Sequence, residues 1–164
     1  MDCNYYGVRQ VTEALLPLMK PKGRIINISS SVGRLKLFSP ELQKQYSRSD
    51  LAVPELDRLQ EMFVSGVRDD TYQTLGYPQQ SYGVTKAGVT AYTKILARLH
   101  KDDPRNLFFA AVCPGWVQTD MNRGKGHLTV DQAVETPIYL ALSDEGRIFA
   151  NNGEFWSRKT VAIW

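Results

Sequence analysis

The segment LFFAAVC, residues 107–113, is a continuous apolar run that the turn-forming pair Pro114-Gly115 ends abruptly. It shows no alternation of apolar and polar residues, which argues against a strand with one face in water. Unbroken apolar runs of this length are typical of central strands in parallel sheets, which helices cover on both faces. Residues 107–113 therefore predict the central strand of an α/β protein.

Two other segments are strand candidates. Residues 24–30, Arg-Ile-Ile-Asn-Ile-Ser-Ser, are rich in β-branched side chains and are flanked by glycine-containing turns, which predicts a buried strand. Residues 153–157, Gly-Glu-Phe-Trp-Ser, predict a last strand, and residues 160–164 are expected to form a tail.

Helical patterns separate these strands. Residues 4–20 predict a helix, and residues 81–101 predict a longer one whose apolar stripe is expected to pack against the sheet. Thr129 to Gln132 has the spacing of a capping box, and the helix that follows to about residue 142 is expected to kink at Pro137. The apolar positions of the first helix are Val8, Val11, Leu15 and Leu18, and those of the second are Val84, Ala87, Ala91, Ile95 and Leu99.

Residues 39–80 differ in character from the segments around them. Ser39-Pro40-Glu41 has the N-cap, first-position proline and acidic first turn of a helix start, and Val53-Pro54-Glu55 begins a second helix. Residues 68–80 are polar and predict a loop. We therefore expect a helical insertion at about residues 39–80.

The order of the elements predicts the fold class. Strand, helix, strand, helix, strand is typical of an α/β protein in which helices cover both faces of a parallel sheet. With 164 residues, 43% of them hydrophobic, the chain has the size and composition of one globular domain. We expect a single domain, residues 1–164, with a doubly wound parallel sheet in three α/β/α layers.

Composition narrows the classes of function. The formal net charge of +3 is spread over interspersed residues, so it favours small anionic ligands but does not support nucleic-acid binding. No apolar run reaches the roughly 20 residues of a membrane span, and no signal-peptide pattern is present. Cys3 and Cys113 lack a Cys-x-x-Cys spacing and are expected to be reduced, as in a cytoplasmic protein. His100 and His127 fit no metal spacing and are expected to face solvent.

The stretch Ser81-Tyr82-Gly83-Val84-Thr85-Lys86 opens the longest predicted helix and places a phenol four residues before an ammonium. Side chains at positions i and i+4 lie on one helix face. A lysine beside a tyrosine hydroxyl stabilises the phenolate and lowers a pKa that is normally about 10. Tyr82 is therefore a candidate acid/base. The alternative is that two amphipathic side chains merely share a helix surface.

Further polar residues follow the predicted strands. Ligands of parallel α/β sheets bind beyond the carboxyl ends of the strands. The first strand ends at Ser29-Ser30-Ser31 and the second at Cys113 to Val117, so hydroxyl groups and a tight turn share that end of the sheet. Taken singly, the serines are equally well a turn or a cap, and Trp116 a packing residue.

Four motifs stand in the order in which they occur in the short-chain dehydrogenases/reductases, and the chain resembles that family. They are Asn4-x-x-Gly7, Ile28-Ser29-Ser30, Tyr82-x-x-x-Lys86 and Cys113-Pro114-Gly115-Trp116-Val117-x-Thr119-Asp120. More narrowly, the chain is similar to the monomeric, NADPH-dependent carbonyl reductases, and this likeness extends to Trp164. It rests on Ser39 to Gln43, Gly76 to Pro78, Pro114 to Val117 and Glu135 to Pro137. The resemblance implies a Rossmann-like fold.

The resemblance also implies four catalytic residues. Tyr82 would donate a proton to the carbonyl oxygen of the substrate, while Lys86 would lower the Tyr82 pKa and hold the nicotinamide ribose. Ser30 would donate a hydrogen bond to the same oxygen. Asn4 would hold a water molecule that relays protons to Lys86.

Cofactor and substrate contacts are implied in the same way. The cofactor is NADPH, and the substrate is a small ketone, aldehyde or quinone that is reduced to an alcohol. The residues expected to contact NADPH are Tyr82, Lys86, Val117, Gln118 and Thr119. The residues expected to contact the substrate are Ser30, Trp116 and Met121.

The chain departs from the family at its start. The family binds the cofactor pyrophosphate at a glycine-rich turn, but no Gly-x-x-x-Gly-x-Gly occurs here, nor an Asn-Asn-Ala-Gly before the first helix. The sequence is therefore expected to be the later part of the domain, truncated at its N-terminus and lacking the first strands. We expect NADPH binding to be weak or absent and the chain alone to have little or no activity.

The sequence is compatible with two functions. The first is the reduction of carbonyl compounds by NADPH with Tyr82 as proton donor. The alternative is a catalytically inactive remnant whose exposed strand, residues 24–30, binds another polypeptide. The resemblance implies a monomer, because the insertion at residues 39–80 covers the helix face that other family members use to dimerise. An exposed sheet edge instead favours self-association.

Overall fold

The computed structural model describes all 164 residues, Met1 to Trp164, and is built around one four-stranded sheet in the order β1-β2-β3-β4. The strands are β1 (Arg24–Ile28), β2 (Phe108–Cys113), β3 (Phe155–Ser157) and β4 (Thr160–Val161). The first three run parallel, as the sequence predicts, and β4 runs antiparallel to β3. The predicted tail therefore contains a strand, which the sequence did not reveal because two residues are too few to show an alternation.

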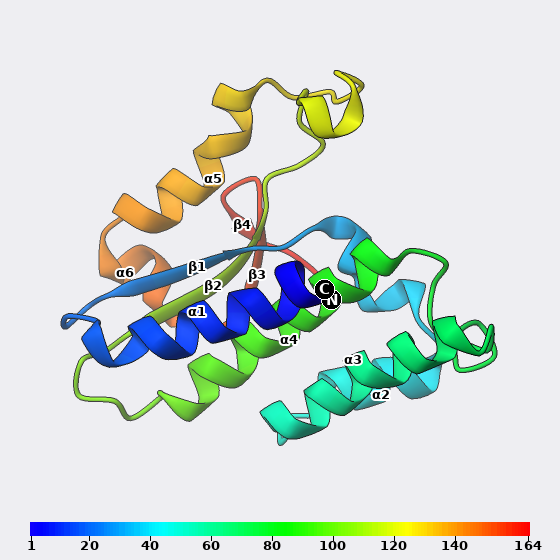
Figure 1. Cartoon of the computed structure of the whole chain (residues 1–164). Helices are drawn as coiled ribbons and strands as arrows, with labels where there is room; N and C mark the ends of the chain where they lie inside the picture. Colours follow the sequence, from blue (N-terminus) through cyan, green and yellow to red (C-terminus); the bar gives the residue numbers. More distant parts are fainter.

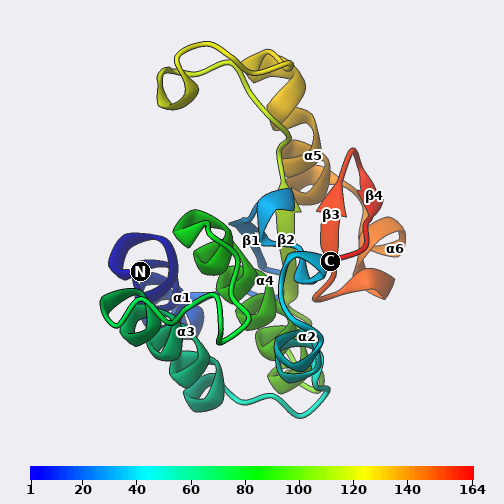
Figure 2. The same cartoon turned by 90° about the vertical axis from the view of Figure 1, so that its right-hand side faces the viewer.

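Helices cover both faces of the sheet, so the predicted three-layer α/β/α architecture is confirmed (Figure 1). On one face lie α1 (Val8–Leu15) and α4 (Ser81–Leu99), and on the other lie α5 (Val130–Leu142) and α6 (Glu145–Ile148). Figure 2 looks at the carboxyl ends of the parallel strands and shows α5 above the sheet and α4 below it.

The burial of the central strand explains why its sequence is uniformly apolar. All six residues of β2 are buried, and its side chains alternate between the two faces of the sheet. Phe109 joins the larger core beneath α4, whereas Phe108 and Ala110 join Leu140 and Ile148 beneath α5 and α6. Because both faces are covered by helices, every position must be apolar, and no alternation is visible in the sequence.

Two helices pack outside α4, in the region predicted to be a helical insertion. They are α2 (Pro40–Ser47) and α3 (Val53–Arg68). The predicted N-cap of α2 is present, because Ser39 Oγ accepts a hydrogen bond from the Leu42 N–H at 3.3 Å. The first turn of α3 is closed by Glu55, whose carboxylate accepts from the Ala52 N–H at 3.0 Å. Local capping chemistry was therefore sufficient to locate both helix starts.

The N-terminal helical segment is less regular than predicted. A π-helical turn (Asp2–Gly7) precedes α1, and a 3-10 turn that contains Pro17 (Leu16–Leu18) follows it. The predicted apolar face is largely exposed, since Val11, Leu15 and Leu18 all lie in contact with solvent. The periodicity correctly predicted a helix, but α1 packs toward α4 through other residues, including the buried Tyr5 and Thr12.

Two further expectations for helix faces and histidines are corrected by the structure. Leu99 belongs to the predicted sheet-facing stripe of α4 but is 61% exposed, because it lies in the last turn, beyond the packed core. His100 is only half-exposed rather than solvent-facing, since its ring stacks on Phe109 and its Nδ1 lies 3.3 Å from Asp103 Oδ2.

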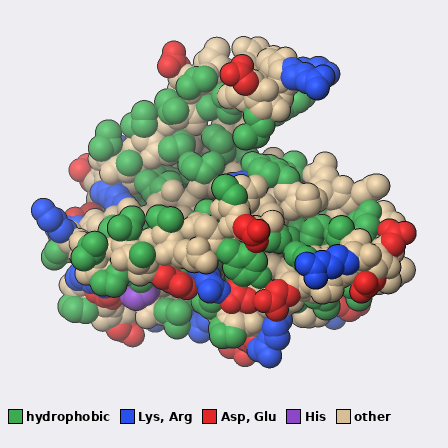
Figure 3. Space-filling view, viewed as in Figure 1, with side chains coloured by type: hydrophobic (Ala, Val, Ile, Leu, Met, Phe, Trp, Pro, Cys, Tyr) green, Lys and Arg blue, Asp and Glu red, His purple; other side chains and the backbone are tan.

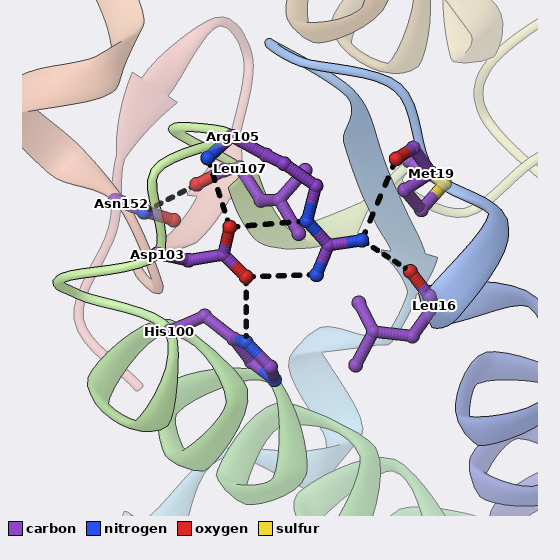
Figure 4. Close-up of polar contacts among 7 residues, drawn as sticks. All are labelled: Leu16, Met19, His100, Asp103, Arg105, Leu107 and Asn152. Carbon is purple, nitrogen blue, oxygen red and sulfur yellow. Dashed lines mark hydrogen bonds and ion pairs between the residues drawn. The ribbon is translucent and has the colours of Figure 1, made fainter.

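A polar cluster joins the segments at the amino end of the sheet (Figure 4). Arg105 donates to both carboxylate oxygens of Asp103, at 3.0 and 2.7 Å, and to the carbonyl of Leu16 at 2.9 Å. Asn152 bridges to β2, donating to the Leu107 carbonyl at 2.9 Å and accepting from the Phe109 N–H at 2.7 Å. These bonds fix the end of the sheet opposite to the predicted site.

Candidate active site

Several of the predicted site residues lie near the carboxyl ends of β1 and β2, the end of the sheet that faces the viewer in Figure 2. A 3-10 turn (Ser31–Gly33) follows β1 and lies against the first turns of α4. Polar residues supplied by three separate segments therefore meet where ligands bind in parallel α/β sheets.

Two glycines allow this close approach. A Cβ atom on Gly33 would lie 2.7 Å from the backbone nitrogen of Ala87, and one on Gly83 would lie 2.5 Å from the carbonyl oxygen of Val32. Both separations are shorter than side chains permit, so only glycine lets the turn after β1 touch α4. The motifs in the sequence do not indicate this role for Gly33. The position of Gly33 shortly after the strand and the serine cluster is the feature of the sequence that could have indicated it.

The phenol of Tyr82 and the ammonium of Lys86 are neighbours, as their spacing predicted. Lys86 Nζ lies 5.4 Å from the centre of the Tyr82 ring. Lys86 is buried and its Nζ donates a 2.6 Å hydrogen bond to the carbonyl of Ile28, at the end of β1. Tyr82 is 42% exposed at the surface of the site. The pair therefore joins α4 to the end of the first strand.

The pKa of Tyr82 is shifted in the direction opposite to the expected one. Burial raises the pKa of Tyr82 above its ordinary value, and the nearby Cys113 thiol raises it further. Burial lowers the pKa of Lys86, an effect that Cys3 partly opposes. The expected lowering of the Tyr82 pKa by Lys86 is not found in this arrangement, in which the ammonium is bonded to the carbonyl of Ile28.

The two serines that end the first strand have different roles. Ser29 is buried, and its hydroxyl donates to the Lys86 carbonyl at 3.0 Å and contacts Thr90 Oγ1 at 2.6 Å. Ser30 caps the following turn, since its Oγ accepts from the Val32 N–H at 3.4 Å. Ser29 is thus a structural residue, and Ser30 is the serine left at the edge of the site.

Asn4 reaches the same site from the π-helical turn at the start of the chain. It lines a cavity of about 450 Å³ together with Tyr82, Thr85 and residues of α3. π-Helical turns are rare and frequently occur at functional sites. The Asn4-x-x-Gly7 motif identifies Asn4 as a candidate, but it carries no sign of the irregular turn on which Asn4 lies.

The residues after β2 lie partly apart from this cavity. Residues 118–128, here called the arm, extend from the body of the protein, and Figure 3 shows the molecule hollowed beneath it. Met121 lies on the arm and is 87% exposed, away from Tyr82. Asn122 Nδ2 donates to the carbonyl of Val117 at 2.6 Å, while Gln118 and Thr119 are exposed at the base of the arm.

Trp116 lies on a second cavity, of about 970 Å³, that begins at Ser31 and Cys113. Its ring meets the exposed His127 edge-on at 4.7 Å. The structure therefore brings Asn4, Ser30, Tyr82 and Lys86 to one end of the sheet and places Trp116 on the adjoining cavity, but it leaves Met121 in solvent.

Both cysteines are free, with Cys113 buried and accepting from the Ser31 N–H at 3.2 Å. No group of three or more His, Cys, Asp or Glu residues is placed to hold a metal ion. None of the helices combines the length and apolar character needed to cross a membrane.

Comparisons with known proteins identify relatives along the whole chain. The sequence is 40% identical over 171 residues to carbonyl reductase (NADPH) 1 of Homo sapiens, an alignment that covers all of this chain and 60% of that protein. It is 42% identical over 169 residues to carbonyl reductase (NADPH) 3 of Mus musculus, again with 100% and 60% covered. The chain thus spans about 60% of the length of the curated relatives that it matches. No family model matches the sequence.

Solved structures agree with these relatives. Salutaridine reductase from Papaver somniferum superposes with a TM-score of 0.83 at 31% identity, over 94% of this chain and 52% of that one. The NADPH-bound carbonyl reductase from chicken fatty liver shares the fold, with a TM-score of 0.60 at 23% identity, over 98% and 54% of the two chains. The predicted resemblance to short-chain dehydrogenases/reductases and, more narrowly, to NADPH-dependent carbonyl reductases is confirmed.

Proposed function

We propose that this chain carries the proton-donating half of an NADPH-dependent reductase that converts ketones, aldehydes or quinones to alcohols. The observation that carries the proposal is the convergence of Tyr82, Lys86, Ser30 and Asn4 at the carboxyl end of a parallel sheet. The 40% identity to a carbonyl reductase supports it.

The residues present fit the nicotinamide end of the cofactor. An ammonium has three donor hydrogens, and Lys86 Nζ uses one of them on the Ile28 carbonyl. Two donors remain for the hydroxyls of a ribose. Val117, Gln118 and Thr119 are proposed to contact the carboxamide and phosphate side, from the base of the arm.

The cofactor supplies the hydride when it is bound, and the protein supplies the proton. Because its pKa is raised, the phenol of Tyr82 is protonated at neutral pH, which is the form that a proton donor requires. Ser30 Oγ accepts from the Val32 N–H, so its own hydrogen is free for the carbonyl oxygen of the substrate. Two donors thus converge on one oxygen and stabilise the negative charge that develops there.

The remaining assignments extend this proposal. Asn4 is proposed to hold a water that returns protons to Lys86, from its place on the Tyr82 cavity. Trp116 and Met121 are proposed to line the substrate pocket, which for Met121 requires the arm to close toward the body. We place the protein in the cytoplasm because its cysteines are free thiols.

The test is to titrate the 164-residue chain with NADPH by calorimetry and to measure quinone reduction over the same concentrations. We expect weak binding, and slow turnover that Tyr82→Phe abolishes. Tyr139→Phe is the matched control, because Tyr139 lies on α5 and has no hydrogen bond through its hydroxyl. Measurable turnover that is equal in wild type and Tyr82→Phe contradicts the proposal.

A second candidate function is supported by the free edge of β1. This strand pairs only with β2, and Figure 1 shows it with α5 above and α1 below. The exposed apolar residues there are Val11 and Leu15 on α1, Leu18 in the 3-10 turn that follows it, and Ile138 and Leu142 on α5. Figure 3 shows apolar side chains gathered over this face. An unpaired strand between apolar helices is suited to binding another polypeptide or a second copy of the chain.

Sedimentation over a range of concentrations tests this candidate. We expect self-association that Leu15→Lys and Ile138→Lys weaken and that Leu99→Lys, a similarly exposed leucine on α4, leaves unchanged. A monomer at all concentrations, which the insertion of α2 and α3 over α4 would favour, argues against association through this edge.

A further inference from the structure

The cavity of about 970 Å³ adjoins the proposed proton donor, Tyr82. Its lining includes charged side chains that the proposed function does not use. The cavity begins at Ser31 and Cys113, next to Ser30 and close to the Tyr82 phenol, and extends to the turn between β3 and β4. A substrate whose carbonyl lies between Ser30 and Tyr82 therefore has room to extend into this cavity.

The lining of the cavity carries more positive than negative charge. Three of its residues, Arg34, Arg158 and Lys159, are cationic, and the sole acidic residue is Glu135. Glu135 is already paired with Lys159 Nζ at 2.7 Å. Neither Arg34 nor Arg158 has a carboxylate partner, and Arg34 Nε is buried without any hydrogen-bond partner. An unpaired, partly buried guanidinium is costly unless a ligand satisfies it.

The turn that carries two of these cations is conformationally unusual. Arg158 and Lys159 have φ angles of 51° and 61°, so both central positions of the β3–β4 turn are left-handed. Turns of this kind strongly prefer Asn-Gly or Asp-Gly, because β-carbons oppose a positive φ. The turn is nevertheless held in place, since the Lys159 N–H donates to Thr136 Oγ1 at 3.1 Å. Fixed strain of this sort is often found at ligand-binding positions.

We propose that this cavity binds a carboxylate on the substrate, with Arg34 as the principal contact and Arg158 as the second. The proposal rests on the proposed function for the position of the carbonyl, and it narrows the substrate class to carbonyl compounds that carry an anionic group. Arg34 suits this role because the planar guanidinium can donate two parallel hydrogen bonds to one carboxylate. The Tyr82 cavity has a single cation among its lining residues, Arg68, so the anion is expected on the Arg34 side.

The experiment compares 4-benzoylbenzoate with its methyl ester, which keeps the ketone and removes the charge. Calorimetric titration of the full chain at low salt should show the acid binding at least about tenfold more tightly than the ester, and high salt should reduce this ratio. Arg34→Gln and Arg158→Gln should each reduce it several-fold, and Arg34→Lys should restore only part of it. Lys36→Gln is the matched control, because Lys36 is exposed two residues away and lies outside the cavity.

The Tyr82→Phe variant distinguishes failure of the anion site from failure of the proposed reductase activity. The variant should keep the acid-to-ester ratio within about twofold even though reduction is lost, so a chain without turnover still tests the anion site. Equal affinity for acid and ester, or an unchanged ratio in both Arg34→Gln and Arg158→Gln, overturns the proposal. Because Arg158 is exposed on a turn, its variant remains informative if Arg34→Gln fails to fold.

Discussion

Lys86 Nζ lies 5.4 Å from the centre of the Tyr82 ring and donates its hydrogen bond to the Ile28 carbonyl. The two side chains share one helix face, as their four-residue spacing requires. The ammonium nevertheless anchors the end of β1, and the desolvated phenol next to it is held in its protonated form.

This arrangement predicts that Tyr82 ionises above pH 10 in the chain without ligands, since burial raises the pKa of the phenol. Ultraviolet difference titration of wild type against Tyr82→Phe measures this ionisation directly, with Tyr139→Phe as the control. The stability that the protonated phenol contributes is present below pH 10 and is lost as the pH rises through the folded-state pKa. A phenol that titrates below 10 and is missing in Tyr82→Phe would contradict the arrangement.

The contact between the turn after β1 and α4 predicts that Gly83→Ala is destabilising. A methyl group there meets the Val32 carbonyl at 2.5 Å, so backbone must move, which typically costs about 1–3 kcal/mol. Any quinone turnover should fall too, because Ser30 and Tyr82 are pushed apart. Gly146→Ala is the control, since nothing lies within 4 Å of its added carbon, and it should be as stable as wild type or about 0.5 kcal/mol more stable. Urea denaturation of both variants gives the comparison, and equal stabilities would refute the close contact.

Asn152 is predicted to be the most sensitive polar residue at the amino end of the sheet (Figure 4). Its amide satisfies the Phe109 N–H and the Leu107 carbonyl, so Asn152→Ala leaves two backbone groups at the start of β2 unpaired. We expect a loss of about 2–3 kcal/mol in the free energy of unfolding. Asn151→Ala, which removes no side-chain hydrogen bond, should lose much less, and a similar loss in both would show that the bridge is unimportant.

Asp103 predicts a dependence of stability on acid pH. The Arg105 guanidinium holds the pKa of this carboxyl well below its usual range. Its stabilising contribution is therefore present above the unfolded-state pKa of about 4 and is lost as the pH falls through the lower, folded-state value. Asp103→Asn should unfold at a lower temperature than wild type at pH 7, and the difference should shrink toward pH 2. Asp102→Asn, at the exposed neighbouring position, should behave like wild type at both pH values. A difference for Asp103→Asn that is as large at pH 2 as at pH 7 would be evidence against the ion pair.

Elements of the fold that have local causes can be predicted from short stretches of the sequence. The apolar run at residues 107–113 required a strand covered on both faces, and Ser39 and Thr129 marked helix starts by their capping chemistry. The spacing of Tyr82 and Lys86 placed them on one helix face. Each of these outcomes depends on residues a few positions apart, so the periodicity and chemistry of the segment are sufficient.

Contacts between groups that are far apart in the chain depend instead on the tertiary structure. It directed the Lys86 ammonium to the Ile28 carbonyl, left Leu15 and Leu99 in solvent, and placed Arg34 on one cavity with the strained turn at Arg158. These positions follow from how the helices pack on the sheet and where close contacts such as that at Gly33 are permitted. Burial and unpaired charge are properties of that packing, and no local pattern in the sequence encodes them.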